Sequence, residues 1–301
     1  MIANGAVPVG WQAGSAPVAV VMIALNERHN IAGVLQNLKG WAQEVILVDS
    51  YSQDDTVDIA LQHGVRVVQR AFRGFGDQWN FALRELHVAA AWTMKLDPDE
   101  RLTDALKASI IDAIAQENAS GIAFDRRLWF MGRPLPIGQE IIRVWKTGSC
   151  RFTDVTVNEH PIVSGRVVRI EGILEHHDSP DLHHWLDKQN RYTTAEALAR
   201  YRKAPFAVQP SLVQGSLARR MWLKKNFTRL PLRYQILFLA NLLRVRPWVT
   251  GRAGLTWARL RVWVHRMIED KFREMCMTGV EVEMPSSSLG LPHPRARQYD
   301  S

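Results

Sequence analysis

VAVVMIAL at Val18–Leu25 is an unbroken apolar run with the length of a single strand. Such a run predicts a strand buried on both faces, which is typical of a parallel sheet. Ile31–Trp41 follows with apolar residues at helical spacing, and Glu44–Val48 (EVILV) is a second buried strand. Four predicted strands alternate with three predicted helices before Asp97, and a fourth helix follows at Thr103–Gln116. This alternation predicts an α/β fold with a doubly wound, mainly parallel sheet and right-handed crossovers.

The pattern changes further along the chain. Short β-like pieces between Gly121 and Ile173 alternate with Gly and Pro, which predicts a mixed or antiparallel extension of the sheet. Asp181–Ala204 is helical in pattern, and Arg-rich helices follow, broken near Pro231, Pro247 and Gly251. We expect four parts: a flexible N-terminal tail (1–17), a catalytic α/β domain (18–204), a basic helical region (205–284) and a disordered tail (285–301).

Composition narrows the class of protein. The hydrophobic fraction of 47% is enough for a core and excludes global disorder. The two cysteines lie far apart, which argues against a disulfide framework or a zinc module and favours a reducing cytoplasm. The N-terminus has no signal-peptide pattern, and no apolar run approaches the ~20 residues that cross a bilayer. We therefore expect a cytoplasmic protein without a spanning helix.

Acidic and amide side chains follow the predicted strands where each strand ends. Asn26 and Glu27 follow the first strand, Asp49 ends the second, and Asp97 and Asp99 follow the fourth. In open α/β sheets, ligands bind at the carboxyl ends of the strands. Two carboxylates at this position can bind Mg²⁺ or Mn²⁺ together with the phosphates of a nucleotide diphosphate. The alternative for Asp97 and Asp99 is an ordinary acidic turn around Pro98.

The other strand-end residues have two readings each. The Asp49 carboxylate can accept the N–H of a nucleobase, whereas Ser52, Asp54 and Asp55 are predicted to cap the following helix. Asn26 and Glu27 could instead form a turn and place negative charge at a helix N-terminus. Gly76 opens another helix, whose N-terminus is expected to face the diphosphate, with Gln78 nearby.

Four ordered pieces of the sequence carry a resemblance to a known family: Ala24-Leu25-Asn26-Glu27, Leu47-Val48-Asp49-Ser50 with Asp54-Asp55-Thr56, Gly74-Phe75-Gly76 with Asn80, and Leu96-Asp97-Pro98-Asp99-Glu100. Together they resemble the signature of glycosyltransferase family 2, of GT-A fold. Within that family the chain resembles the lipopolysaccharide core β-glucosyltransferase group. The pieces that suggest this group are Arg143-Val144-Trp145, Val157-Asn158-Glu159, Glu175-His176-His177, Lys188-Gln189-Asn190-Arg191-Tyr192-Thr193 and Gly251-Arg252-Ala253-Gly254.

The resemblance implies an inverting transfer of a sugar, glucose from a UDP donor, to a hydroxyl of a lipid-linked saccharide such as the lipopolysaccharide inner core. It implies Mg²⁺ or Mn²⁺ as cofactor, with Asp97 and Asp99 as the metal residues. Asp97 would also hold the ribose or a metal-bound water. The donor-binding residues would be Ala24, Asn26, Glu27, Asp49, Gln78, Asn80 and Asp97.

The general base that the transfer requires is expected from the Val-x-Glu element. Glu159 is the candidate, and His160 is the substitute because an ordinary histidine pKa also suits proton abstraction near neutrality. In the family His often precedes the glutamate, whereas here Asn158 precedes it and His160 follows. A surface carboxylate in a turn is the plainer reading of Glu159. Other departures are Pro98 in the metal motif and Thr250 before the C-terminal Gly-Arg turn.

The C-terminal third is strongly basic. From Arg200 to Ile268 there are fifteen Lys and Arg residues and no Asp or Glu. Arg252, Arg259 and Arg266 recur every seven residues, with Trp257 and Trp263 between them. This pattern predicts helices on an anionic membrane surface, at the inner face of the cytoplasmic membrane, although a helical face packed on the catalytic domain fits it too. Rival functions are a nucleotidyltransferase and a nucleic-acid-binding protein. The region matches no common recognition module, so no nucleic-acid partner is expected.

Overall fold

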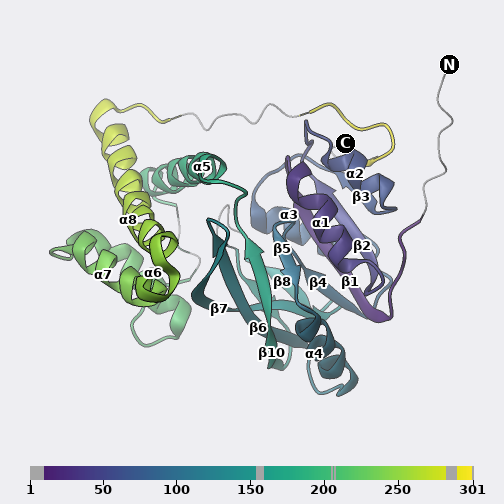
Figure 1. Ribbon diagram of the computed structural model, residues 1–301. Helices are drawn as coiled ribbons and strands as arrows, with labels where there is room; N and C mark the ends of the chain where they lie inside the picture. The colour runs from purple at the N-terminus through teal and green to yellow at the C-terminus, as the bar shows by residue number, and fades with distance from the viewer. Residues whose placement is uncertain (1–9, 154–158, 205, 207, 283–289, 300–301) are drawn as a thin grey trace. The chain divides into compact units, whose positions relative to one another are not determined.

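The computed structural model describes residues 10–153, 159–204, 206, 208–282 and 290–299 (Figure 1). The chain divides into two compact units. The first contains Met1–Arg127, Gly138–His177 and Ser288–Ser301, and the second contains Leu128–Ile137 and Asp178–Ser287. The first unit holds the sheet and the second is mainly helical, so each is described by itself.

The sheet of the first unit has nine strands in the order β11-β3-β2-β1-β4-β7-β6-β10-β5. Strand β1 pairs in parallel with both β2 and β4, and β3 extends the parallel part beyond β2. Strand β7 is antiparallel to β4, and β10 is antiparallel to β5. The bounds are β1 Ala16–Ala24, β2 Ala42–Asp49, β3 Arg66–Gln69, β4 Trp92–Lys95, β5 Glu100–Leu102, β6 Gly121–Phe130, β7 Arg133–Lys146, β10 Val167–His177 and β11 Arg297–Gln298. The mainly parallel sheet and its mixed extension are therefore confirmed.

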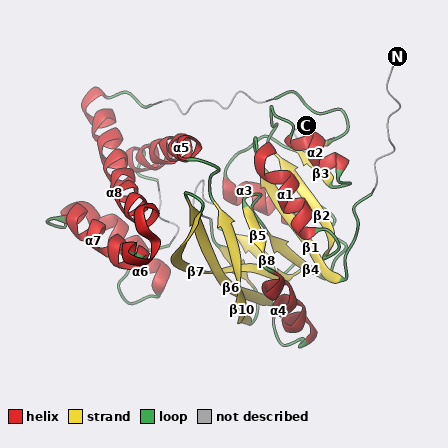
Figure 2. Ribbon diagram, in the orientation of Figure 1, coloured by secondary structure: helices red, strands yellow, loops and turns green. Residues whose placement is uncertain are grey.

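Helices pack on both faces of this sheet (Figure 2). They are α1 Arg28–Leu38, α2 Thr56–Gln62, α3 Phe75–Glu85 and α4 Asp104–Ala115. Val20 and Met22 of β1 face one core with α1 and α4, whereas Val21 faces the other with Trp79 of α3. The side chains of these three β1 residues are fully buried, as the apolar run predicted. A smaller sheet pairs β8 Cys150–Phe152 with β9 Pro161–Val163.

The second unit is built around a long helix. Its elements are α5 Leu182–Tyr201, α6 Ser216–Asn226, the short 3₁₀ helix η1 Phe227–Arg229, α7 Arg233–Val245 and α8 Pro247–Thr278. Both α5 and α7 pack against α8. Pro247 begins α8, and Gly251 bends it with φ +61°, a value that favours glycine. The breaks predicted at these residues are present. Among the described residues, we find no helix with the length and apolar character needed to cross a bilayer.

One domain limit differs from the prediction. Helix α5, expected within the catalytic domain that ends at residue 204, belongs to the second unit, because it buries Ala197 and Leu198 in a cluster with Met275 of α8. Trp257, predicted at a membrane surface, is instead buried in the core of the helical unit, and Trp263 packs half-buried against that core. Amphipathic spacing alone does not show which apolar residues a neighbouring helix covers.

Both predicted tails are partly ordered. Residues 1–9, 285–289 and 300–301 lie outside the described residues, but Trp11 donates a hydrogen bond from Nε1 to the carbonyl of Ala42 over 3.0 Å. At the other end, Arg297 and Gln298 form β11, which pairs in parallel with β3. The prediction of a disordered tail is therefore corrected for residues 290–299. Their partners lie more than 200 positions earlier in the chain, beyond the reach of local sequence pattern.

Candidate active site at the carboxyl ends of the strands

The parallel pairing brings three predicted strand ends to one edge of the sheet. Ala24 at the end of β1 pairs with Asp49 at the end of β2, and Val21 pairs with Lys95 at the end of β4. The loops that follow these strands carry Asn26, Glu27 and the turn that begins at Asp97. The predicted position of these residues at one edge of the sheet is confirmed. In open α/β sheets, ligands bind at this edge.

Hydrogen bonds join the first two loops. The Asn26 N–H donates to Ser52 Oγ over 2.8 Å, and the Asn26 side-chain oxygen accepts from the Gln53 N–H over 2.8 Å. The Glu27 N–H donates to Thr56 Oγ1 over 2.8 Å. Asp54 accepts from the Thr56 N–H at the start of α2 and also from the Arg28 N–H. Asp55 is the N-cap residue of α2 but makes no side-chain capping bond, and Ser52 bonds to Asp49, so the predicted capping is not seen for these two. The loops therefore form one hydrogen-bonded rim beside Asp49.

Asp49 is completely buried beneath this rim. Its Oδ2 accepts hydrogen bonds from the Ser52 N–H over 2.9 Å and from Gln69 Nε2 over 2.8 Å. Its Oδ1 accepts from the Ser52 hydroxyl. Burial raises the pKa of Asp49 above its usual value, although the bonds from Gln69 and Ser52 oppose the rise. A nucleobase N–H would reach Oδ1 beside or in place of the Ser52 hydroxyl.

Gln78 and Asn80 lie on α3 with different surroundings. Gln78 is buried and accepts a hydrogen bond from Arg70 Nη1 over 2.9 Å. Asn80 exchanges two bonds with the backbone of Phe152, one in each direction, at 3.0 and 2.8 Å. The Asn80 amide thus joins α3 to β8, which is a structural role that the sequence did not indicate.

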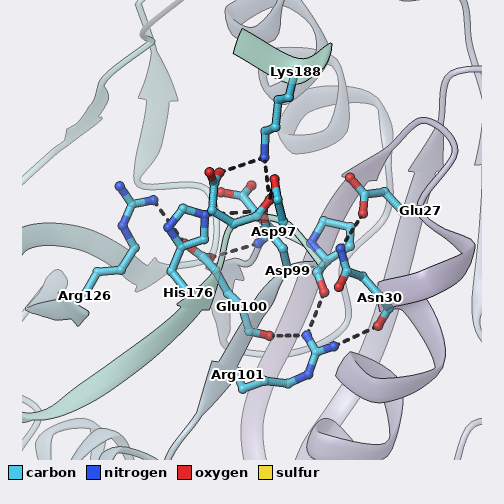
Figure 3. Close-up of polar contacts among 12 residues, drawn as sticks. Glu27, Asn30, Asp97, Asp99, Glu100, Arg101, Arg126, His176 and Lys188 are labelled. Carbon is cyan, nitrogen blue, oxygen red and sulfur yellow. Dashed lines mark hydrogen bonds and ion pairs between the residues drawn. The ribbon is translucent and has the colours of Figure 1, made fainter. Parts of the chain in front are cut away.

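The segment from Asp97 to Glu100 forms a tight, charged turn (Figure 3). The Asp97 N–H donates to Glu100 Oε2 over 3.0 Å, and the Glu100 N–H donates to the Asp97 carbonyl over 2.9 Å. Buried Arg143, from β7, contacts Asp97 Oδ2 at 2.9 Å and Glu100 Oε1 at 2.6 Å. Burial alone would raise the pKa of Asp97, but Arg143 and Lys95 outweigh it and hold the pKa at about 2. Asp97 is therefore ionised at neutral pH, and 32% of its side chain remains exposed.

Asp99 lies against a histidine from a distant strand. Pairing of β10 with β5 brings His176 opposite Glu100, and His176 Nε2 lies 3.3 Å from Asp99 Oδ2. The Asp99 carbonyl accepts the His177 N–H over 2.8 Å, which fixes the approach of the two segments. A carboxylate oxygen and an imidazole nitrogen are both ligands of divalent transition metals. In the sequence His176 belongs only to one piece of the family resemblance, and only the strand pairing brings it to Asp99.

Glu159 is paired with a lysine close to the acidic turn. Its Oε1 lies 2.5 Å from Lys95 Nζ, and both side chains are about nine-tenths buried, with 11% and 10% exposed. The Lys95 ammonium also lies 4.5 Å from the ring centroid of Trp79, a cation–π contact. The His160 N–H donates to Thr153 Oγ1. Val157 and Asn158, the rest of the predicted Val-x-Glu element, lie outside the described residues.

The ion pairs of Arg143 give a stability prediction. Arg143→Met would leave the buried Glu100 and the partly exposed Asp97 without their main cation, so we expect the free energy of unfolding to fall by about 3–5 kcal/mol. Arg169→Met is the matched control, because Arg169 is 60% exposed and pairs with Asp125 at the surface, where about 0–1 kcal/mol is typical. Urea unfolding of the three proteins measures both values. Equal losses in the two variants would contradict the role given to Arg143.

A doubly wound sheet with acidic side chains at its strand ends is the arrangement of a ligand-binding α/β domain. Comparison with known families makes this specific, because residues 19–167 match "Glycosyl transferase family 2". The chain therefore contains a glycosyltransferase family 2 domain, and the GT-A-like fold class is confirmed.

Individual relatives are more distant. An uncharacterized glycosyltransferase from Rickettsia typhi is 27% identical over 199 residues, which cover 60% of this chain and 66% of that protein. One from Rickettsia felis is 34% identical over 117 residues, covering 38% and 41%. The chain thus spans less than two thirds of the length of these relatives.

Solved structures also resemble the chain at low identity. A mannosyltransferase from Pyrobaculum calidifontis, in complex with GDP-Man and Mn²⁺, is 15% identical with a TM-score of 0.45, covering 88% of this chain and 90% of that one. TarS 1-349 from S. aureus, in complex with UDP-GlcNAc, is 16% identical with a TM-score of 0.42, covering 85% and 91%.

Proposed function

We propose that this protein is an inverting, metal-dependent glycosyltransferase that moves glucose from a UDP donor to an acceptor hydroxyl. The observation that carries the proposal is the group of acidic side chains at the carboxyl ends of β1, β2 and β4 within a family 2 domain. Asp99 and His176 would hold Mg²⁺ or Mn²⁺, with Asp97 beside them. The ion would neutralise charge on the departing diphosphate.

The donor nucleotide would lie along the rim formed by the first two loops. Asn26 and Glu27 would line the pocket beyond Ala24, and Asp49 would accept the N–H of uracil. Asp97, held ionised by Arg143, would accept hydrogen bonds from the ribose. Gln78 and Asn80 would contribute by fixing α3, whose first turn would face the diphosphate.

Glu159 would act as the general base. The acceptor oxygen attacks the anomeric carbon as its proton passes to the Glu159 carboxylate, and the bond from that carbon to the diphosphate oxygen breaks. Attack from the face opposite the leaving group inverts the configuration. The ion pair with Lys95 keeps the carboxylate in a defined position, which general-base catalysis requires. His160 stays the alternative base.

The acceptor would be a lipid-linked saccharide, such as the lipopolysaccharide inner core, at the inner face of the cytoplasmic membrane. An apolar stripe supports a membrane surface as partner. Leu232, Ile236, Leu239 and Leu243 recur on one face of α7 and its N-cap, and each side chain is 55–70% exposed. Trp248 and Val249, at the start of α8, are also about seven-tenths exposed, at 71% and 70%. A helix with an exposed apolar face in a basic segment fits an anionic bilayer surface.

Membrane binding is tested with two variants. Ile236→Ser/Leu239→Ser/Leu243→Ser removes apolar insertion, and Arg252→Glu/Arg259→Glu/Arg266→Glu reverses exposed charges worth about 1 kcal/mol each near an anionic leaflet. We expect each variant to lower co-sedimentation with phosphatidylglycerol-containing vesicles at least ~10-fold. The charge-dependent part should weaken with salt. Val213→Ser/Met277→Ser, two other exposed apolar residues, is the control. If co-sedimentation changes neither with salt nor in either variant, these helices serve packing alone.

The function itself is tested by thermal shift with UDP-, GDP- and dTDP-sugars, each with Mn²⁺ and with EDTA. A ligand at 100 times its Kd adds about 2.7 kcal/mol to the free energy of unfolding. We expect the UDP-sugar to give the largest rise in Tm, and only with the metal. A rise in Tm with only the GDP- or dTDP-sugar would show that the donor is not a UDP-sugar.

A further inference from the structure

The C-terminal segment lies on the sheet unit beside the proposed donor site. Gln69, the last residue of β3, is 1% exposed and links the two. Its Nε2 donates to Asp49 Oδ2 over 2.8 Å, while its Oε1 accepts the His293 N–H over 2.7 Å and Gln298 Nε2 over 3.0 Å. A carboxylate on one side and N–H donors on the other fix the orientation of the Gln69 amide.

Further contacts hold this segment in place. The Tyr299 N–H donates to the Gln69 carbonyl over 3.0 Å, and the Tyr299 ring packs on Phe81 of α3 with centroids 5.1 Å apart. His293 Nε2 lies 3.2 Å from Asp58 Oδ1 of α2. The segment is thus joined to β3, to α2 and to α3, which flank the edge of the sheet.

The segment also reaches the loop that covers Asp49. The Gly290 N–H donates to the Tyr51 carbonyl over 2.8 Å. A Cβ at Gly290 would lie 2.5 Å from the Ser52 carbonyl oxygen, so the two backbones are too close for any larger residue. Residues 290–299 therefore contact both neighbours of Asp49: Gln69 directly and Ser52 through its backbone.

We propose that residues 290–299 are a positioning element of the donor site, which acts through Gln69 to orient the Asp49 carboxylate toward the nucleobase. This inference rests on the proposed UDP-dependent function. Gln69 and the Ser52 N–H both donate to Oδ2, so that Oδ1 is the oxygen left for a ligand N–H, beside or in place of the Ser52 hydroxyl. Gln69 and Gln298 are positioning residues and do not touch the substrate.

A purely structural role makes a different prediction. If β11 only covers the edge of β3, its loss lowers stability and leaves nucleotide selectivity unchanged. If β11 orients Asp49, its loss weakens binding of the nucleotide whose base offers an N–H to the carboxylate. Uracil carries an N–H at the ring position where cytosine has an acceptor nitrogen, so UDP and CDP separate the two roles.

The test measures the Kd of UDP and of CDP by calorimetry with Mn²⁺, in the full chain and three variants. These are a chain that ends at Ser287, Gln69→Leu and Gln298→Leu; Arg295→Ala, whose exposed side chain does not contact Gln69, is the control. We expect UDP binding to weaken at least ~10-fold, about 1.4 kcal/mol, in the shortened chain and in Gln69→Leu. Gln298→Leu should show a smaller loss. The ratio of the Kd of CDP to the Kd of UDP should fall. The KM for the donor should rise, with kcat nearly unchanged.

Two outcomes separate the inference from the function on which it rests. Asp49→Asn is measured alongside. If it weakens UDP while the shortened chain and Gln69→Leu bind like the full chain, the inference is overturned and the proposed function stands. If the full chain binds no UDP with Mn²⁺, the proposed function fails first. If the shortened chain does not fold, Gln69→Leu and Gln298→Leu still decide the question, and an unchanged ratio of UDP to CDP affinity in both overturns the inference.

Discussion

Asp99→Asn should reduce turnover by at least ~10³-fold, which corresponds to about 4 kcal/mol of transition-state stabilisation. The carboxylate lies at the end of the β4–β5 turn, 3.3 Å from His176, and is only 6% exposed. Removing its charge would remove an oxygen ligand that a divalent ion prefers. The variant should also lose any rise in Tm that Mn²⁺ produces in the presence of UDP.

The matched control for this substitution is Asp112→Asn on the exposed side of α4, which should behave like the unmodified chain. His176→Ala should show a partial loss of the same metal-dependent stabilisation, because one proposed ligand remains. Full activity of the unmodified protein in excess EDTA would contradict the proposed metal dependence, whatever the effect of Asp99→Asn.

Glu159→Gln should lower kcat at least ~10²-fold and leave the Kd of UDP nearly unchanged. The substitution keeps the size of the side chain but removes the carboxylate that would take the proton from the hydroxyl of the acceptor saccharide. It also leaves Lys95 without its counter-ion, so the free energy of unfolding must be measured as well. Glu171→Gln, an exposed residue of β10, controls for loss of one negative charge.

The alternative base gives the opposite result. If Glu159→Gln turns over normally and His160→Ala does not, the base is one residue further along the chain. If both variants turn over normally, the proton leaves by a group outside this segment.

The parts of the fold that the sequence predicted are those determined by neighbours in the chain. The apolar run from Val18 and the acidic residues after each strand mark the parallel sheet and its ligand-binding edge without any tertiary information. Asp97 and Asp99 were found in this way, because both follow β4 directly. Whether they bind a metal stays a prediction.

The partners of those residues come from elsewhere in the chain. Antiparallel strands bring in Arg143, which holds Asp97 ionised, and His176, which lies beside Asp99. The register of these strands cannot be predicted from the spacing of neighbouring residues. Gln69 gave no signal at all, because its importance depends on β11, more than 200 residues away. The seven-residue spacing of Arg252, Arg259 and Arg266 correctly placed them on the exposed side of α8, but Trp257 is a core residue and Trp263 packs half-buried against the same core.

The most direct measurement is transfer of labelled glucose from UDP-glucose into a lipid-linked saccharide, followed with Mn²⁺ and with EDTA. We expect label in the lipid fraction only with the metal, with inverted configuration at the anomeric carbon of the product, and no label with Asp99→Asn. Metal-dependent transfer from UDP-glucose with retained configuration would contradict the inverting mechanism. Absence of transfer and of UDP release from UDP-glucose, under conditions in which the protein is folded and holds Mn²⁺, would contradict the proposed glucosyltransferase activity itself.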